Sequence, residues 1–102
     1  MIKTKVGNID VGKTEKKILE ILNKSATLNQ EGIRKKLKRE SKVYNELNRM
    51  IEKKLLEKIY DPSFMQNYYS LAKKGHDVSK KLGIKSELVF LERGKVVKNP
   101  YR

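Results

Sequence analysis

The spacing of apolar residues changes from helical to strand-like within one short stretch, residues 41–60. Its first part repeats apolar residues every three or four positions, which places them on one face of a helix. They are Val43, Leu47, Met50 and Ile51. The second part, residues 55–60, reads as a strand. A short amphipathic helix that runs directly into a strand predicts a mixed fold, and it leaves the polar side of that helix open.

The residues before this stretch predict two more helices. The first covers residues 13–24, and its aliphatic face comprises Ile18, Leu19, Ile21 and Leu22. Residues 23–29 read as a loop, and residues 1–12 read as a polar arm or a short strand. The second helix covers residues 30–38, with Asn29 as the expected N-cap.

The second and third helices are expected to form a helix-turn-helix. Residues 38–41 make a tight turn, and Ser41 is the predicted cap of the third helix. Two short helices joined by so short a connection are the sequence signature of this motif.

The residues after the stretch predict a β-hairpin, a fourth helix and a second hairpin. Residues 61–67 contain Asp-Pro and form a turn, so residues 68–72 return as the second strand. Residues 73–83 read as a helix that ends at Gly83. The last segment, residues 86–102, suggests another hairpin with its turn at Arg93-Gly94. The expected class is therefore α+β.

This order of elements resembles the winged helix-turn-helix family of DNA-binding proteins over residues 13–82. The sequence IRKKL (33–37) looks like the positioning helix, and SKVYNELNRMIEKKLLEKI (41–59) looks like the recognition helix and the first wing strand. The sequence YYSLAKKG (68–75) looks like the second wing strand with the Tyr-x-Leu-Thr-x-x-Gly signature. The resemblance is greatest to regulators of the MarR, ArsR and PadR types and to small archaeal or archaeal-virus relatives.

The chain departs from the family pattern at two positions. Lys54 stands where the family often ends its recognition helix with a left-handed glycine, a conformation that is costly for lysine. Ala72 replaces the customary threonine and removes a good N-cap from the fourth helix. The resemblance implies a winged-helix domain over residues 13–82, with an arm at 1–12 and a C-terminal hairpin or tail at 83–102.

The charge of the chain indicates a polyanionic partner. The 102 residues carry a formal net charge of +13, and nucleic acid most often neutralises an excess of this size. The chain has no cysteine and no apolar run of membrane-spanning length. An anionic membrane is the rival partner for such a charge. Because the order of elements resembles a DNA-binding family, we expect double-stranded DNA as the partner, no membrane, and a cytoplasmic, nucleoid-associated location.

The polar side of the third helix has the side chains that read bases in a major groove. Asparagine pairs with adenine and arginine with guanine through two hydrogen bonds each. The candidates on and beside this helix are Ser41, Lys42, Tyr44, Asn45, Asn48 and Arg49. Three cations would hold flanking phosphates, namely Arg34, Lys35 and Lys38. The wing would add Lys58, Ser63 and Gln66.

Other interpretations remain open at this point. A solvated charged face, a non-specific architectural nucleic-acid-binding protein and a protein-interaction module all fit parts of the pattern. No catalytic constellation is evident, so we expect neither an enzyme nor a cofactor. His76 is the only histidine, which argues against a histidine-based metal site. The resemblance implies a homodimer, because most regulators of the family are two-fold dimers. The usual long dimerisation helix is missing here, so we expect the C-terminal hairpin, alone or with the N-terminal arm, to supply the self-association surface; this hairpin includes the apolar residues 88–91.

Overall fold

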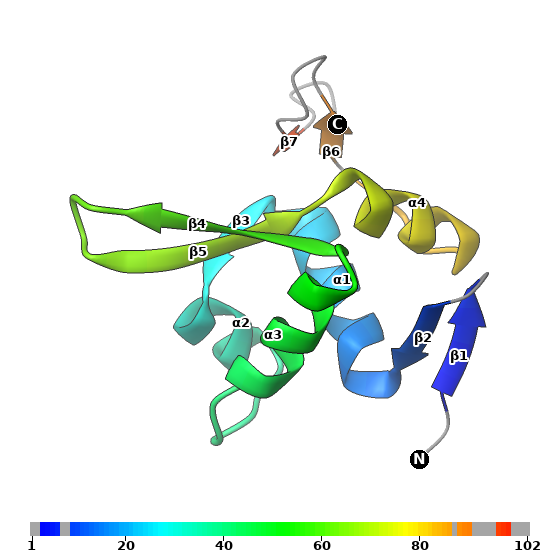
Figure 1. Ribbon diagram of the computed structural model, residues 1–102, viewed down its shortest axis with the longest axis horizontal. Helices are drawn as coiled ribbons and strands as arrows, with labels where there is room; N and C mark the ends of the chain where they lie inside the picture. The colour runs from blue at the N-terminus through cyan, green and yellow to red at the C-terminus, as the bar shows by residue number, and fades with distance from the viewer. Residues whose placement is uncertain (1–2, 7–8, 87, 91–95, 99–102) are drawn as a thin grey trace.

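The computed structural model describes residues 3–6, 9–86, 88–90 and 96–98. These residues form four helices, a three-stranded antiparallel sheet and two separate two-stranded hairpins (Figure 1). The expected α+β class is confirmed. None of the helices within these ranges combines the length and apolar character that a bilayer crossing requires.

The N-terminal segment is a β-hairpin that packs on the domain. Strand β1 (Lys3–Val6) pairs antiparallel with β2 (Ile9–Gly12), and helix α1 (Lys13–Ser25) follows at once. Val11 of β2 is 1% exposed and belongs to the hydrophobic core. The predicted strand is confirmed, but a second strand and the anchoring of the arm were not predicted.

The predicted loop at 23–29 is wrong. Helix α1 continues to Ser25, and Thr27–Asn29 form strand β3, which pairs antiparallel with β5. Strand β3 has only one apolar residue, Leu28, so its sequence has no periodicity to read. Its pairing with Tyr69 of β5 comes from residues distant in the chain. Helix α2 (Gln30–Lys36) follows, and the predicted Asn29 cap is confirmed, since its side chain accepts a 2.8 Å hydrogen bond from the Gly32 N–H.

The connection between α2 and α3 is longer than predicted. Helix α2 ends two residues early, and Lys38 takes a left-handed φ of 56°. Helix α3 (Tyr44–Glu52) begins after Ser41, with Val43 at its N-cap, so the cap predicted for Ser41 is wrong. Gln30 of α2 instead accepts a 3.2 Å hydrogen bond from the Val43 N–H. A long-range contact thus sets the start of α3.

The central sheet extends into a projecting hairpin. Strands β4 (Leu56–Asp61) and β5 (Gln66–Leu71) pair from Leu56–Leu71 at the base to Asp61–Gln66 at the tip. The strand order is β3-β5-β4, and the outer part of β4–β5 stands clear of the helices (Figure 1). The predicted hairpin is confirmed, with a shorter turn than expected, because Gln66 and Asn67 belong to β5.

The C-terminal elements follow the predicted order. Helix α4 (Lys73–Lys81) is succeeded by Gly83 at φ 77°, as expected for a helix end. Its N-cap Ala72 makes no side-chain capping bond. Strands β6 (Leu88–Phe90) and β7 (Val96–Lys98) pair antiparallel. The turn predicted at Arg93-Gly94 and the side chains of residues 88–91, which the sequence assigned to self-association, lie outside the described residues.

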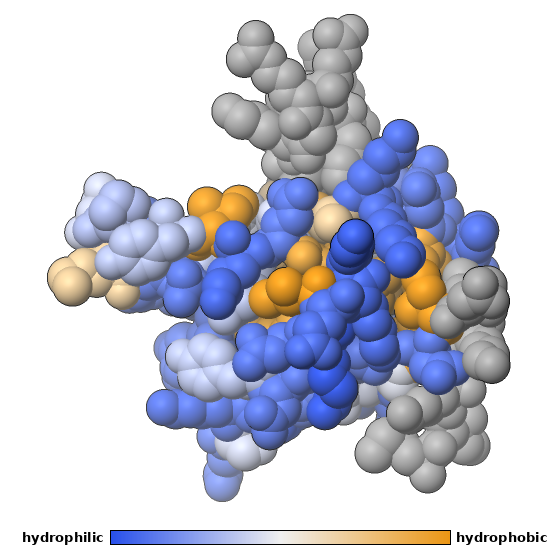
Figure 2. Space-filling model, viewed as in Figure 1, coloured by the Kyte–Doolittle hydropathy of each residue, from blue (hydrophilic) through white to orange (hydrophobic). Residues whose placement is uncertain are grey.

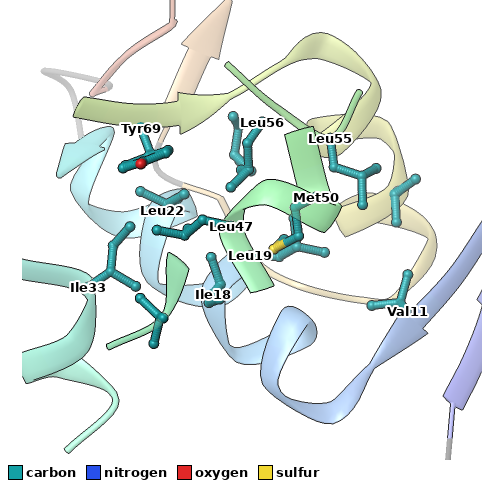
Figure 3. Packing of buried hydrophobic residues seen from close by; sticks show 13 residues of the cluster. Val11, Ile18, Leu19, Leu22, Ile33, Leu47, Met50, Leu55, Leu56 and Tyr69 are labelled. Atoms are coloured by element: carbon teal, nitrogen blue, oxygen red, sulfur yellow. The ribbon is translucent and has the colours of Figure 1, made fainter. Parts of the chain in front are cut away.

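The core is shared by all the central elements (Figure 3). Its largest fully buried side chains come from α1, α2, α3 and the sheet. They include Ile18, Leu19, Leu22, Ile33, Leu47, Met50, Leu55 and Leu71. Two residues predicted to lie on buried helix faces, Ile21 and Ile51, are only partly buried. Buried Asn23 was missed; its amide donates to Leu19 O at 2.7 Å and to Ser79 Oγ at 2.9 Å, which joins α1 to α4.

Lys54 adopts the left-handed conformation that was expected to be too costly for it, with φ 63°. Its side chain is exposed. We expect Lys54→Gly to raise the free energy of unfolding by about 1 kcal/mol, because glycine relieves this strain. Urea denaturation measures the change. The control is Lys24→Gly, in the last turn of α1, which should lower the free energy of unfolding by about 1 kcal/mol through lost helix propensity. If the free energy of unfolding fell equally in both variants, the prediction would be contradicted.

Candidate nucleic-acid interface

Helix α3 presents an open polar face. Leu47 and Met50 are fully buried, and Glu46 and Ile51 are partly buried. The exposed residues of the helix are Tyr44, Asn45, Asn48, Arg49 and Glu52. Asn48 lies one turn away from Tyr44, Asn45 and Glu52, so it occupies the middle of this face. Glu52 was not among the predicted site residues, although its position in the same period could have indicated it.

Three side chains of this face form no hydrogen bond or ion pair with the described residues. Within the described part of the chain, Asn45, Asn48 and Arg49 make no side-chain hydrogen bond or ion pair. Their donors and acceptors are therefore available to a partner. An exposed amide can form hydrogen bonds to water without any cost in free energy. The lack of a protein partner therefore does not by itself identify what these side chains bind.

The other predicted residues are also accessible, with one exception. Exposed side chains are those of Lys35, Lys38, Ser41, Lys42, Lys58, Ser63 and Gln66. Arg34 is half-buried; it pairs with Glu31, and its Nη1 donates to the Arg39 carbonyl oxygen at 2.7 Å. Most of the N–H donors of Arg34 are therefore used in bonds within the protein, which leaves few of them for a partner.

Arg39 holds the segment that leads into α3. Its Nε donates to Ser41 Oγ at 2.7 Å and its Nη2 to Lys42 O at 2.9 Å, and Nη1 pairs with Glu46. Burial acts to raise the pKa of Glu46. A hydrogen bond from Arg39, a bond from the backbone N–H of Glu46 and the charges of Arg39 and Arg49 together outweigh it, so this pKa lies below its usual value. The exposed Ser41 and Lys42 are thus displayed on an ordered segment, and sequence reasoning did not identify Arg39.

A groove of about 440 Å³ separates the start of α3 from the β4–β5 hairpin. Asn29, Lys42 and Tyr44 line one side, and Gln66 and Asn67 line the other. A 2.7 Å hydrogen bond from Asn29 Nδ2 to Gln66 Oε1 links the two sides. The Lys42 Nζ lies 5.9 Å from the centroid of the Tyr44 ring. The groove is lined mainly by hydrogen-bonding groups, and its charged lining residues are one exposed cation, Lys42, and one exposed carboxylate, Glu31.

The β4–β5 hairpin turns both buried and exposed side chains toward this groove. Lys58 pairs with Tyr69 and Tyr60 with Asn67, so these residues share the face of the groove. Tyr69 is itself 2% exposed and part of the core, and burial, with a smaller effect of Tyr44, raises its pKa. The three tyrosines of the hairpin therefore do not form one stacking surface. Ile59 and Tyr60, by contrast, are half exposed.

A second hollow, of about 570 Å³, lies where α1 begins beside the end of α3. Lys53 Nζ binds Glu15 Oε2 at 3.0 Å and the Asp10 carbonyl oxygen at 2.6 Å. The Gly12 N–H donates to Glu15 Oε1 at 3.0 Å. A carboxylate of the chain thus occupies the start of α1, where the Gly-Lys-Thr sequence would otherwise offer backbone donors to a phosphate.

The described residues contain no group of histidine and carboxylate side chains that could hold a metal ion. His76 lies partly buried in α4, where burial and the charge of Lys80 lower its pKa.

Comparison with protein-family models, with curated proteins and with solved structures found no match to this chain. The functional assignment therefore depends on the geometry and charge of the chain itself.

Proposed function

We propose that this chain is a winged-helix, sequence-specific regulator that binds double-stranded DNA through α3. The observation that carries the proposal is the exposed polar face of α3, whose amide and guanidinium groups make no side-chain hydrogen bond or ion pair with the described residues. The net charge of +13 supports it, because a duplex neutralises such an excess. In this arrangement α3 enters the major groove, and the β4–β5 hairpin is the wing.

The groove between α3 and the hairpin supports the same arrangement. When a helix occupies the major groove of B-DNA, an adjacent element lies across one sugar-phosphate strand from it. Lys42, Tyr44 and Gln66 would bond that strand, and Lys58 would approach it from the hairpin. Lys35 and Lys38 would contact the flanking backbone. These contacts position the protein, and the side chains of α3 read the bases.

A salt titration of duplex binding tests the proposal. If the four exposed lysines Lys35, Lys38, Lys42 and Lys58 each neutralise one phosphate, the association constant should fall about a hundredfold between roughly 50 and 200 mM salt. Fluorescence polarisation of a labelled duplex measures it. A tight complex without this salt dependence, or no complex at low salt, would contradict DNA binding.

The distribution of charge favours a second candidate function, non-specific architectural binding. Exposed lysines also stand on α1 and α4, outside the α3 face, including Lys16, Lys17, Lys73, Lys74, Lys80 and Lys81. A protein that packages DNA uses charge on several surfaces and needs no base contacts. Selection from random duplexes separates the two functions: a consensus sequence favours the regulator, and its absence favours the architectural protein.

A further inference from the structure

The tip of the β4–β5 hairpin differs in chemistry from the rest of the surface. The chain has 25 lysines and arginines, yet residues 61–67 contain none of them, and Asp61 is their only charged residue. The most exposed large apolar side chains stand at this tip, with Phe64 68% and Met65 79% exposed. Figure 2 shows the less hydrophilic end of the hairpin against a mainly hydrophilic helical body. Such exposed apolar groups indicate a binding function.

The backbone of the tip supports a role for the Met65 side chain itself. Met65 has a left-handed φ of 51°, a conformation that turns usually assign to glycine or asparagine. The turn is otherwise well ordered, since Asp61 Oδ1 accepts a 2.8 Å hydrogen bond from the Ser63 N–H. Retained strain of this kind is typical of functional positions.

The position of the tip indicates where these side chains would act on DNA. Met65, Gln66 and Asn67 line the same groove as Lys42 and Tyr44 at the start of α3. With α3 in the major groove, the tip lies across one sugar-phosphate strand and faces the neighbouring minor groove. That groove is about 6 Å wide, too narrow for a two-stranded hairpin but wide enough for single side chains.

We infer that Phe64 and Met65 form an apolar wedge that inserts between base pairs from the minor groove and bends the DNA, an inference that rests on the proposed function. Apolar side chains that enter the minor groove separate stacked bases and kink the duplex toward the major groove. The absence of lysine and arginine from residues 61–67 fits this role, because the wedge contacts bases rather than phosphates. The lysines elsewhere on the interface supply the attraction to the backbone.

The test measures binding and bending of one duplex in the same sample. The probe is a duplex of about 30 base pairs with central TA steps, which unstack easily, and with a fluorescent donor and acceptor at its ends. Polarisation reports binding, and energy transfer reports bending. The wild-type protein should bind and increase energy transfer. Phe64→Ala should abolish the increase while lowering affinity by less than about tenfold, because the contacts of the wedge largely offset the cost of unstacking.

Two further variants separate the wedge from folding. Met65→Gly relieves the left-handed backbone, so it should raise the melting temperature and still reduce bending. Ile59→Ala, which truncates an exposed apolar side chain on the same hairpin but away from the turn, is the matched control and should bend DNA as the wild type does. Binding without bending by the wild type, or full bending by Phe64→Ala and Met65→Gly, would overturn the wedge and leave the proposed function standing. If the wild type binds no duplex, the proposed function fails and the wedge fails with it.

Discussion

Replacing Gly75 by alanine is expected to destabilise the protein by about 3 kcal/mol or more, although glycine-to-alanine changes in helices usually stabilise by about 1 kcal/mol. A Cβ at this position would lie 2.1 Å from the carbonyl oxygen of Leu55 and 3.0 Å from its carbonyl carbon. Because the obstacle is backbone, no side-chain rotation can relieve the clash. Either α4 must move away or the chain between α3 and β4 must shift.

The contact at Gly75 joins the parts of the fold that carry the candidate interface. Leu55 is fully buried, and its carbonyl oxygen also accepts a 2.9 Å hydrogen bond from the Ala72 N–H at the start of α4. The first turn of α4 therefore packs directly on the junction between α3 and the projecting hairpin. A displacement there would disturb the relative placement of α3 and β4–β5.

Urea denaturation of Gly75→Ala measures this effect, with Lys74→Ala as the matched control. Lys74 is exposed on the same turn of α4, so its substitution should change the free energy of unfolding by less than about 0.5 kcal/mol. If Gly75→Ala is as stable as the wild type, the close approach of α4 to Leu55 is wrong.

Periodic segments of the sequence predicted their structure well. Helices α1 and α3 each bury a regular set of apolar residues, so local spacing is sufficient to locate them. The Asp-Pro turn marks the β4–β5 hairpin. Gly75 ends the stretch that resembles a family signature, but the sequence could not give the physical reason for a glycine there, which is the Leu55 carbonyl oxygen in a distant segment.

The incorrect predictions concern segments that distant residues determine. Strand β3 exists because it pairs with β5, and α3 starts after Ser41 because Gln30 and Arg39 hold the preceding residues. A serine before a helical period is a good local cap, but local rules cannot weigh it against a bond from another helix.

The open face of α3 follows from the spacing of its buried residues, so the sequence could predict it. The groove beside it could not be predicted, because it depends on how far the hairpin projects and on which side. Phe64 and Met65 were missed for a related reason. An apolar pair inside a predicted turn suggests local packing, and only the structure places both in solvent.

Asn48→Ala is expected to reduce discrimination between the preferred DNA site and other duplexes by about 10- to 100-fold. Asn48 lies at the middle of the α3 face, and within the described residues its amide has no hydrogen-bond partner. In the proposed complex it would bond both N6 and N7 of an adenine, and alanine would leave those base atoms unpaired. The duplex recovered by selection and a scrambled duplex of equal length provide the comparison.

Lys35→Ala is the matched control, since it removes one exposed charge from α2 and no base contact. It should weaken binding to both duplexes equally. It should also reduce, by about one, the magnitude of the slope of the logarithm of the association constant against the logarithm of salt concentration. Asn48→Ala should leave that slope unchanged, because an uncharged amide releases no counterion. If Asn48→Ala instead weakens both duplexes equally, α3 does not read bases at its centre, and the architectural function becomes the better account of the charge.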